Sequence, residues 1–435
     1  MDAPLSAHFA SREPSVIRRA QIEFARRRDG VEAINVAIGN VSLPMHPALQ
    51  ERLRSLGHAG SPFAAGAVRY TATAGLPETN QAFLNIIAAS GFETARLHCQ
   101  ITDGGSQAMA LMIVGCCGPA GSPERPLLLI DPAYTNYKSF AERLGRGTIS
   151  LTRSLGADGR FSLPDPAAIE AVIAAHRPGA MVVIPYDNPT GQLYTHAQLV
   201  DLARLCVRYG MWLVSDEAYR ELYYRGDAPV SVWGLTEADV PGIGGRRISI
   251  ETCSKVWNAC GLRIGALVTD NEELHARAVA ENTAGLCSNH IGQWIFGALA
   301  QQSRADLQVW FAQQREYYRG MLAAFTADMR RLVPGVIVSS PDASIYSVVD
   351  VREVVPADFD ALAFVIWCAR TGCCQVGDRK LTLLTAPMSG FYSLPAGAAN
   401  PGRTQMRVAY VETPESMRLV PGLLADLLAK YAAQR

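Results

Sequence analysis

The sequence has 435 residues, of which 49% are hydrophobic and 18% are charged, and its 40 basic and 40 acidic side chains cancel. A chain of this length can bury a substantial core, and it predicts two or three domains, or a large domain with a smaller one. The neutral charge argues against nucleic acid as a partner, and the longest apolar run, around residues 108–114, is too short to span a membrane.

The first third of the chain changes from an isolated helix and strand to a repeating pattern. Residues 14–28 predict a helix that ends at Gly30, and residues 33–38 predict a strand. From about residue 99, short apolar runs alternate with helical segments, which predicts an α/β domain with a mainly parallel sheet flanked by helices. We expect seven strands, at 99–101, 127–130, 148–151, 181–184, 212–214, 248–250 and 266–269, with helices such as 107–114, 166–175 and 196–209 between them.

A second change of pattern begins near Asp306, where residues 307–332 predict one long helix. Strand-like segments and further helices follow, so we expect a smaller α+β domain formed by the N-terminal and C-terminal segments. Its expected strands are 335–339, 345–349 and 406–410. The predicted division is 1–50 as an N-terminal segment packing with the small domain, 51–306 as the large domain and 307–435 as the C-terminal small domain.

The ten cysteines and eight histidines show no spacing that is typical of a metal site. We therefore expect no metal and interpret the cysteines as reduced residues that are mostly buried. The N-terminal residues lack the charged head and apolar stretch of a signal peptide. Together these features predict a cytoplasmic protein.

Polar groups follow several predicted strands, at the edge where an open parallel sheet binds its ligands. Each has an ordinary explanation on its own: a turn at Asn188, a helix cap at Asp216, a solvated lysine at Lys255. Their occurrence together, each at a strand end, is much harder to explain by chance. The segments are Thr102 to Gln107, Asp131 to Tyr137, Pro185 to Gly191, Ser215 to Tyr219, and Glu251 to Lys255 with Gly261 to Gly265 after it.

These groups share one chemical purpose. A lysine amine can hold an aldehyde cofactor as a Schiff base, and an aspartate can keep a pyridine nitrogen protonated so that the ring accepts electrons. Amide and phenol groups can hydrogen-bond a phenolate oxygen, and an aromatic ring can stack on the cofactor. A helix N-terminus, hydroxyls and an arginine can bind phosphate. Pyridoxal 5′-phosphate (PLP) requires all of these groups.

From about Val31 to about Leu428, the sequence resembles fold-type I PLP-dependent enzymes of the class I/II aminotransferase family. The most specific motif is Ser254-Lys255 followed by the segment from Gly261 to Gly265. The Asn188-Pro189-Thr190-Gly191 and Asp216-Glu217-Ala218-Tyr219 segments support it.

The resemblance implies a role for each matching position. Lys255 corresponds to the Schiff-base lysine, whose freed amine moves the proton between the substrate Cα and the cofactor C4′. Asp216 would pair with the pyridine nitrogen, Asn188 and Tyr219 would contact the phenolate oxygen, and Tyr134 would stack on the ring. Positions that correspond to phosphate contacts are Gly105, Ser106, Gln107, Thr252, Ser254 and Arg263.

Three further positions concern the substrate and the partner subunit. Arg407 resembles the arginine that binds the substrate α-carboxylate, and Gly39 and Asn188 match substrate-binding positions. Tyr70 matches a tyrosine that reaches the cofactor phosphate of the neighbouring subunit, so the resemblance implies a homodimer. Ser106 stands where some aspartate-specific relatives have a lysine, which makes that type of dicarboxylate specificity less favoured.

Three functions remain open from the sequence. The first is an aminotransferase that moves an amino group from an L-amino acid to a 2-oxo acid by a ping-pong Schiff-base mechanism. The second is a lyase, decarboxylase or biosynthetic synthase that uses the same PLP site. The third is a non-catalytic PLP-binding sensor of a transcription regulator, which the neutral charge and the short segment before the first strand disfavour.

Overall fold

The computed structural model describes residues 3–226, 228–339, 342–395 and 397–434. The chain forms two compact units, and each is assembled from segments that are distant in the sequence. Unit 1 comprises Met1–Gly39, Ala324–Val338 and Val348–Arg435, and unit 2 comprises Asn40–Ala323 and Ser339–Ser347.

Unit 2 contains a seven-stranded sheet with the strand order β2-β10-β9-β8-β7-β3-β4. The five strands from β9 to β4 are parallel, whereas β10 runs antiparallel to both of its neighbours. The predicted α/β class and all seven predicted strands are therefore confirmed. The strands are β2 (His98–Asp103), β3 (Leu127–Asp131), β4 (Thr148–Thr152), β7 (Ala180–Val183), β8 (Trp212–Asp216), β9 (Arg247–Thr252) and β10 (Ile264–Thr269).

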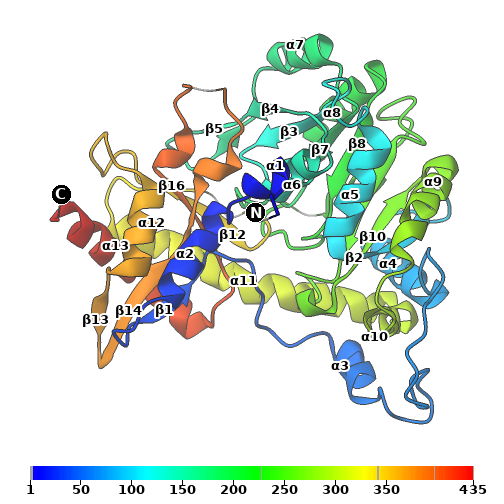
Figure 1. Ribbon diagram of the computed structural model, residues 1–435, viewed down its shortest axis with the longest axis horizontal. Helices are drawn as coiled ribbons and strands as arrows, with labels where there is room; N and C mark the ends of the chain where they lie inside the picture. Colours follow the sequence, from blue (N-terminus) through cyan, green and yellow to red (C-terminus); the bar gives the residue numbers. More distant parts are fainter. Residues whose placement is uncertain (1–2, 227, 340–341, 396, 435) are drawn as a thin grey trace. The chain divides into compact units, whose positions relative to one another are not determined.

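Helices connect and flank these strands (Figure 1). Helix α8 (His196–Arg208) shows why they form, because Thr195 and Gln198 make a reciprocal cap at its start. Its buried side chains recur every three or four residues, which gives the helix one apolar face. The other helices of the unit are α3 (Pro47–Arg54), α4 (Pro77–Ala89), α5 (Gly104–Cys116), α6 (Thr135–Arg143), α7 (Pro166–His176), α9 (Glu272–Asn282) and α10 (His290–Gly297). A small hairpin is made of β5 (Ser154–Leu155) and β6 (Phe161–Ser162).

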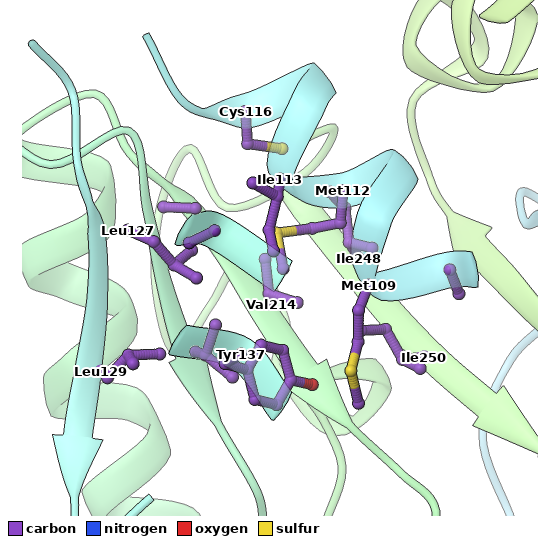
Figure 2. Close-up of a cluster of buried hydrophobic side chains, with 14 of the residues drawn as sticks. Met109, Met112, Ile113, Cys116, Leu127, Leu129, Tyr137, Val214, Ile248 and Ile250 are labelled. Atoms are coloured by element: carbon purple, nitrogen blue, oxygen red, sulfur yellow. The ribbon is translucent and has the colours of Figure 1, made fainter. Parts of the chain in front are cut away.

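The core of unit 2 fixes α5 and α6 against one face of the sheet. Figure 2 shows the α5 side chains Met112 and Ile113 turned toward Val214 of β8 and Ile248 of β9. Tyr137 of α6 joins the same cluster and is fully buried. Burial of such side chains favours folding by about 1.5–3 kcal/mol each. The apolar contacts therefore hold the N-terminus of α5 at the carboxyl edge of the parallel strands.

Unit 1 brings the two ends of the chain into one sheet. Strand β1 (Glu32–Asn35) pairs in parallel with β14 (Arg379–Leu384), which pairs with β13 (Cys374–Val376). The predicted α+β character of the smaller domain is confirmed. A four-stranded sheet has the order β11-β12-β16-β15, with bounds Ile337–Val338, Tyr346–Asp350, Gln405–Ala409 and Ala386–Pro387. The helices are α1 (Ala7–Ala10), α2 (Val16–Ala25), α12 (Ala361–Arg370) and α13 (Pro414–Ala432), and α11 (Arg304–Leu332) begins in unit 2 and ends in unit 1.

Candidate active site

The candidate site lies where four neighbouring parallel strands of unit 2 end. The sheet order is β9-β8-β7-β3; Lys255, Asn188 and Tyr134 lie in the loops after β9, β7 and β3, and Asp216 is the last residue of β8. Because parallel strands point the same way, their carboxyl ends form one edge, and ligands of such sheets bind there. The structure thus brings these four predicted residues to one edge of one sheet.

Asp216 ends β8 and is buried beneath the sheet edge. The hydroxyl of Tyr137 donates to its Oδ2 over 2.9 Å, and the Ala218 amide donates to Oδ1 over 3.1 Å. Burial raises the pKa of Asp216 to about 6, and the Tyr137 and Ala218 hydrogen bonds and the charge of Lys255 oppose that rise. A cation beside this carboxylate would stabilise the ionised form and so lower the pKa of Asp216 from this raised value. Asp216 is therefore suited to hold a protonated ring nitrogen.

Tyr137 is a functional candidate that the sequence did not reveal. Its pKa is raised well above the usual value, first by burial and then by the charge of Asp216. The phenol consequently keeps its proton and remains a donor to the carboxylate at all ordinary pH values. No local motif marks this residue, because its contact with β8 depends on how α6 packs on the sheet.

A chain of hydroxyl and amide groups lies beside Asn188. The Nδ2 of Asn188 donates to the Tyr219 hydroxyl over 3.4 Å, and that hydroxyl lies 2.9 Å from the hydroxyl of Tyr346. All three side chains are buried. Tyr346 was not predicted from the sequence, because it lies 127 residues beyond Tyr219 and follows no recognisable motif.

Lys255 is partly buried in the loop that follows β9. Its charge lowers the pKa of Asp216, so the two side chains act on each other electrostatically. The hydroxyls of Thr252 and Ser254, at the start of the same loop, lie 2.7 Å apart. This short segment therefore presents one amine and two hydroxyl groups.

The N-terminus of α5 forms a cradle with Arg263. Gly104 begins the helix at φ +67°, and a Cβ atom at this position would overlap the Arg263 guanidinium. Strands β2 and β10 set this approach, because Asp103 pairs with Ile264 in their register. Free backbone N–H groups at a helix start and a guanidinium favour an anion.

The other residues of this region that were predicted to contact the cofactor differ in burial and in hydrogen-bond partners. Gly105 and Ser106 lie in the first turn of α5 and are partly buried. The Gln107 amide receives the Asp103 N–H over 2.7 Å and donates to Asn282 over 2.7 Å, so protein groups engage both of its ends. The Tyr134 hydroxyl accepts a hydrogen bond of 2.8 Å from Asn136, and the ring is partly buried.

The other predicted positions are carried by other segments of the chain. Tyr70 of unit 2 is 79% exposed. Gly39 and Arg407 belong to unit 1, where Arg407 is buried in β16 and its Nη2 donates to the Ala37 carbonyl over 2.7 Å. The Arg407 guanidinium also lies over the ring of Phe391, 5.1 Å from its centroid.

The family model described as aminotransferase class I and II matches residues 34–373 of the chain. The chain belongs to this family. It is an aminotransferase, an enzyme that transfers an amino group between an amino acid and a 2-oxo acid. The predicted family, enzyme class and reaction are confirmed.

This aminotransferase is similar to several characterised proteins. The aspartate/prephenate aminotransferase of Thermus thermophilus is 25% identical over 339 residues, which cover 77% of this chain and 81% of the relative. The 2-aminoadipate transaminase of Thermus thermophilus is 31% identical over 211 residues, or 48% of this chain and 50% of the relative.

Solved structures share its fold. An aspartate aminotransferase of Thermus thermophilus aligns with a TM-score of 0.78 and 21% identity over 98% of this chain and 100% of that one. The kynurenine aminotransferase of Pyrococcus horikoshii aligns with a TM-score of 0.77 and 18% identity over 98% and 97% of the two chains.

The donor set of this aminotransferase fits PLP, the cofactor that its family uses. A buried carboxylate, an amide–phenol pair, an amine and a helix N-terminus beside a guanidinium match the ring nitrogen, phenolate, aldehyde and phosphate. Among the residues that the structure describes, no group of three His, Cys, Asp or Glu side chains is placed to hold a metal ion. In the same described part, no helix is long and apolar enough to cross a membrane.

Proposed function

We propose that this aminotransferase uses PLP held covalently by Lys255. The observation that supports this most strongly is the placement of Lys255, Asp216, Asn188 and Tyr134 at the carboxyl ends of four adjacent strands. When bound, PLP supplies an electron sink that stabilises negative charge at the substrate Cα. The protein must then hold the ring and move one proton.

The side chains of unit 2 divide these tasks. Asp216, ionised and oriented by Tyr137, would hold the proton on the ring nitrogen. Asn188 and Tyr219 would donate to the phenolate oxygen. The Nζ of Lys255, once released by the substrate amine, would act as the base that accepts the proton of Cα. Tyr134 would stack on the ring, and Tyr219 and Lys255 would complete the catalytic set with Asp216.

The phosphate group would lie at the N-terminus of α5. Gly105 and Ser106 would offer backbone N–H groups, and Arg263 would supply the charge. Thr252 and Ser254 would add hydroxyl donors from the neighbouring loop. Gln107 would contribute through its position in the first turn of α5, because its side-chain oxygen already accepts the backbone N–H of Asp103 at the start of that helix.

We propose that Arg407 binds the α-carboxylate of the amino acid donor and of the 2-oxo acid acceptor, and that Gly39 and Asn188 also contribute to substrate binding. A guanidinium recognises a carboxylate through two parallel hydrogen bonds. Because donor and acceptor share this group, they would occupy the site in turn, which is the basis of a ping-pong reaction.

A homodimer is proposed from the exposed side chains around Tyr70. Val68 is 59% exposed, Tyr70 79% and Leu286 51%, and exposed apolar side chains that lie together mark interaction surfaces. The segments of Tyr70 and Leu286 adjoin, since the Thr71 amide donates to the Cys287 Sγ atom over 3.4 Å. Tyr70 would complete the phosphate site of the neighbouring subunit.

The ten cysteines are all free, which favours a reducing compartment such as the cytoplasm. Several are buried, and burial raises the pKa of Cys253 to about 12. We therefore propose a cytoplasmic enzyme.

The function is tested by half-reactions of the purified holoenzyme with a panel of amino donors and 2-oxo acids, followed by cofactor absorbance. Stoichiometric conversion of an added 2-oxo acid to its amino acid is expected. Lys255→Ala should retain cofactor and lose turnover by several orders of magnitude, whereas Lys138→Ala, an exposed lysine of α6, should match the wild type. Release of ammonia without an acceptor, or full turnover of Lys255→Ala, would contradict the proposal.

The dimer has its own test. Lys255→Ala and Tyr70→Ala, each inactive alone, are mixed under conditions that exchange subunits. Hybrid dimers contain one site with both wild-type residues, so activity should reappear. A monomer in sedimentation, or no recovery from a mixed dimer, would exclude the role of Tyr70.

A further inference from the structure

A buried arginine joins two of the loops that form the candidate site. Arg153 follows β4 directly and is 4% exposed. Its Nη2 lies 2.7 Å from the Pro132 carbonyl oxygen and 3.3 Å from that of Ile130. The same atom lies 2.9 Å from Oδ2 of Asp187.

The two loops that Arg153 contacts carry proposed cofactor ligands. The Pro132 carbonyl comes two residues before Tyr134, and Asp187 directly precedes Asn188. Strands β7, β3 and β4 are neighbours in the sheet, so the three loops leave the same edge side by side. From the end of β4, Arg153 therefore contacts both the loop that would stack on the ring and the loop that would bind its phenolate oxygen.

The Asp187 end of this link is itself held in place. Its carboxylate accepts hydrogen bonds from the hydroxyl and the backbone amide of Thr190, which fixes the turn around Asn188. Its backbone carbonyl accepts from Ser344 over 3.0 Å. Burial raises the pKa of Asp187, and the nearby Arg153 charge opposes the rise, so the guanidinium favours the ionised carboxylate.

The Arg153 guanidinium uses two of its nitrogens, since Nε also lies 3.4 Å from the Asp131 carbonyl oxygen. A planar guanidinium can contact backbone carbonyls and a carboxylate at once, whereas a lysine ammonium is a compact point charge. A buried ion pair alone is weak evidence for a stabilising role, because removing both charges is often harmless. A simple ion pair needs no contact with the backbone. The contacts of Arg153 with the backbone carbonyl groups before Tyr134 therefore indicate an additional role.

From these contacts we infer that Arg153, paired with Asp187, is a positioning residue that sets the spacing between Tyr134 and Asn188 and thereby the fit of PLP. This inference rests on the proposed function. Arg153 makes no contact with the cofactor in this role and acts through the two loops. The expected consequence is a loss of cofactor affinity and order that exceeds any loss of stability.

The test measures three quantities for each variant: the dissociation constant of added PLP for the apoprotein, the visible circular dichroism of the bound cofactor, and the thermal midpoint. Arg153→Lys keeps the charge beside Asp187, so it should unfold near the wild-type temperature. It should bind PLP about tenfold more weakly, which corresponds to about 1.4 kcal/mol. Its circular dichroism band should also shrink, because the ring is held less rigidly.

The double variant Arg153→Met/Asp187→Asn distinguishes the effect of Arg153 on the spacing of the two loops from the effect of an unpaired buried charge. Removing both charges should return most of the thermal stability that Arg153→Met loses, without returning the PLP affinity. Arg160→Met is the matched control, since it breaks a 2.6 Å ion pair with Asp342 in the same unit and should leave PLP binding unchanged.

Each outcome decides the inference. Wild-type PLP affinity and dichroism in Arg153→Lys, or in the double variant, would show that the pair is only a structural ion pair and overturn it. If the double variant does not fold, Arg153→Lys alone decides. Failure of the wild-type protein itself to bind PLP would instead overturn the proposed function.

Discussion

The hydroxyl group of Tyr137 donates a 2.9 Å hydrogen bond to Oδ2 of Asp216, and both side chains are buried. This phenol is the largest of the influences that lower the pKa of Asp216 against the effect of burial. It also leaves the second oxygen of the carboxylate to the Ala218 amide. The aspartate is thus fixed in orientation and kept easier to ionise before any cofactor arrives.

Tyr137→Phe should weaken PLP binding by about tenfold or more, since a hydrogen bond to a charged group contributes about 1.5–3 kcal/mol. The pKa of Asp216 should rise in the variant, so the defect should grow as the pH is lowered. Titration of the apoprotein with PLP, followed by tryptophan fluorescence, measures both effects. Tyr392→Phe, which removes a buried 2.6 Å hydrogen bond to Gln405 in unit 1, is the control. Equal affinity in the two variants would refute the role of Tyr137.

The raised pKa of Asp216 also makes the stability of the apoprotein depend on pH. The carboxyl group holds its proton up to about pH 6 in the folded state but only to about 3.8 when unfolded. Raising the pH through this window therefore removes protons from the unfolded chain first, and folding becomes less favourable. Asp216→Asn removes this titrating group. As the pH is raised from about 4 to about 6, the thermal midpoint of the variant should therefore rise relative to that of the wild type. Asp201→Asn, which removes an exposed carboxylate of α8, is the control for the loss of one acidic group.

Tyr346→Phe tests the hydroxyl pair. Tyr219 has one phenolic proton, so if it donates to the cofactor oxygen, Tyr346 must donate to Tyr219 across the 2.9 Å contact. Loss of this support should raise the pH at which the absorbance of the bound cofactor changes, by up to about one unit for a hydrogen bond of about 1 kcal/mol. An unchanged absorbance titration would show that Tyr346 serves packing alone.

Gly104→Ala tests the anion cradle. The added methyl group would meet the Arg263 guanidinium, and its backbone would be held at a φ of +67° that costs about 1–2 kcal/mol for alanine. Gly210→Ala is a matched control, because Gly210 has nearly the same φ, +66°, with no atom within 4 Å of the added Cβ. Both variants should lose stability, but only Gly104→Ala should lose affinity for PLP and for inorganic phosphate. Equal phosphate affinity in the two would contradict the cradle.

The fold was predictable where the sequence has regular patterns. Short runs with β-strand character located all seven strands of the large sheet, and several of them are continuously apolar, as strands covered on both faces often are. Strand β14 was not predicted, since it begins with the charged residues Arg379 and Lys380 and only its second half is apolar. Its pairing with β1 joins segments more than 340 residues apart, which no local pattern encodes.

The site was predictable only in part, for a related reason. Asp216 ends a strand and Lys255 and Asn188 lie in the loops after two others, so the topology alone predicted that they gather at one edge. Tyr137, Tyr346 and Arg153 contact that edge from a helix, from a distant segment and from the end of β4. Tyr137 and Tyr346 do not directly follow a strand of the large sheet, and the link from Arg153 to Asp187 depends on side-chain packing, which no local pattern encodes.

The pairing of β2 with β10 has a practical consequence for engineering. Asp103 pairs with Ile264 in the ladder, so the start of α5, directly after β2, and Arg263, directly before β10, are held in register. A single deletion or insertion in either strand would move one half of the cradle by a full residue step and turn its side chains to the opposite face. Engineered variants of this enzyme should therefore keep the lengths of both strands unchanged.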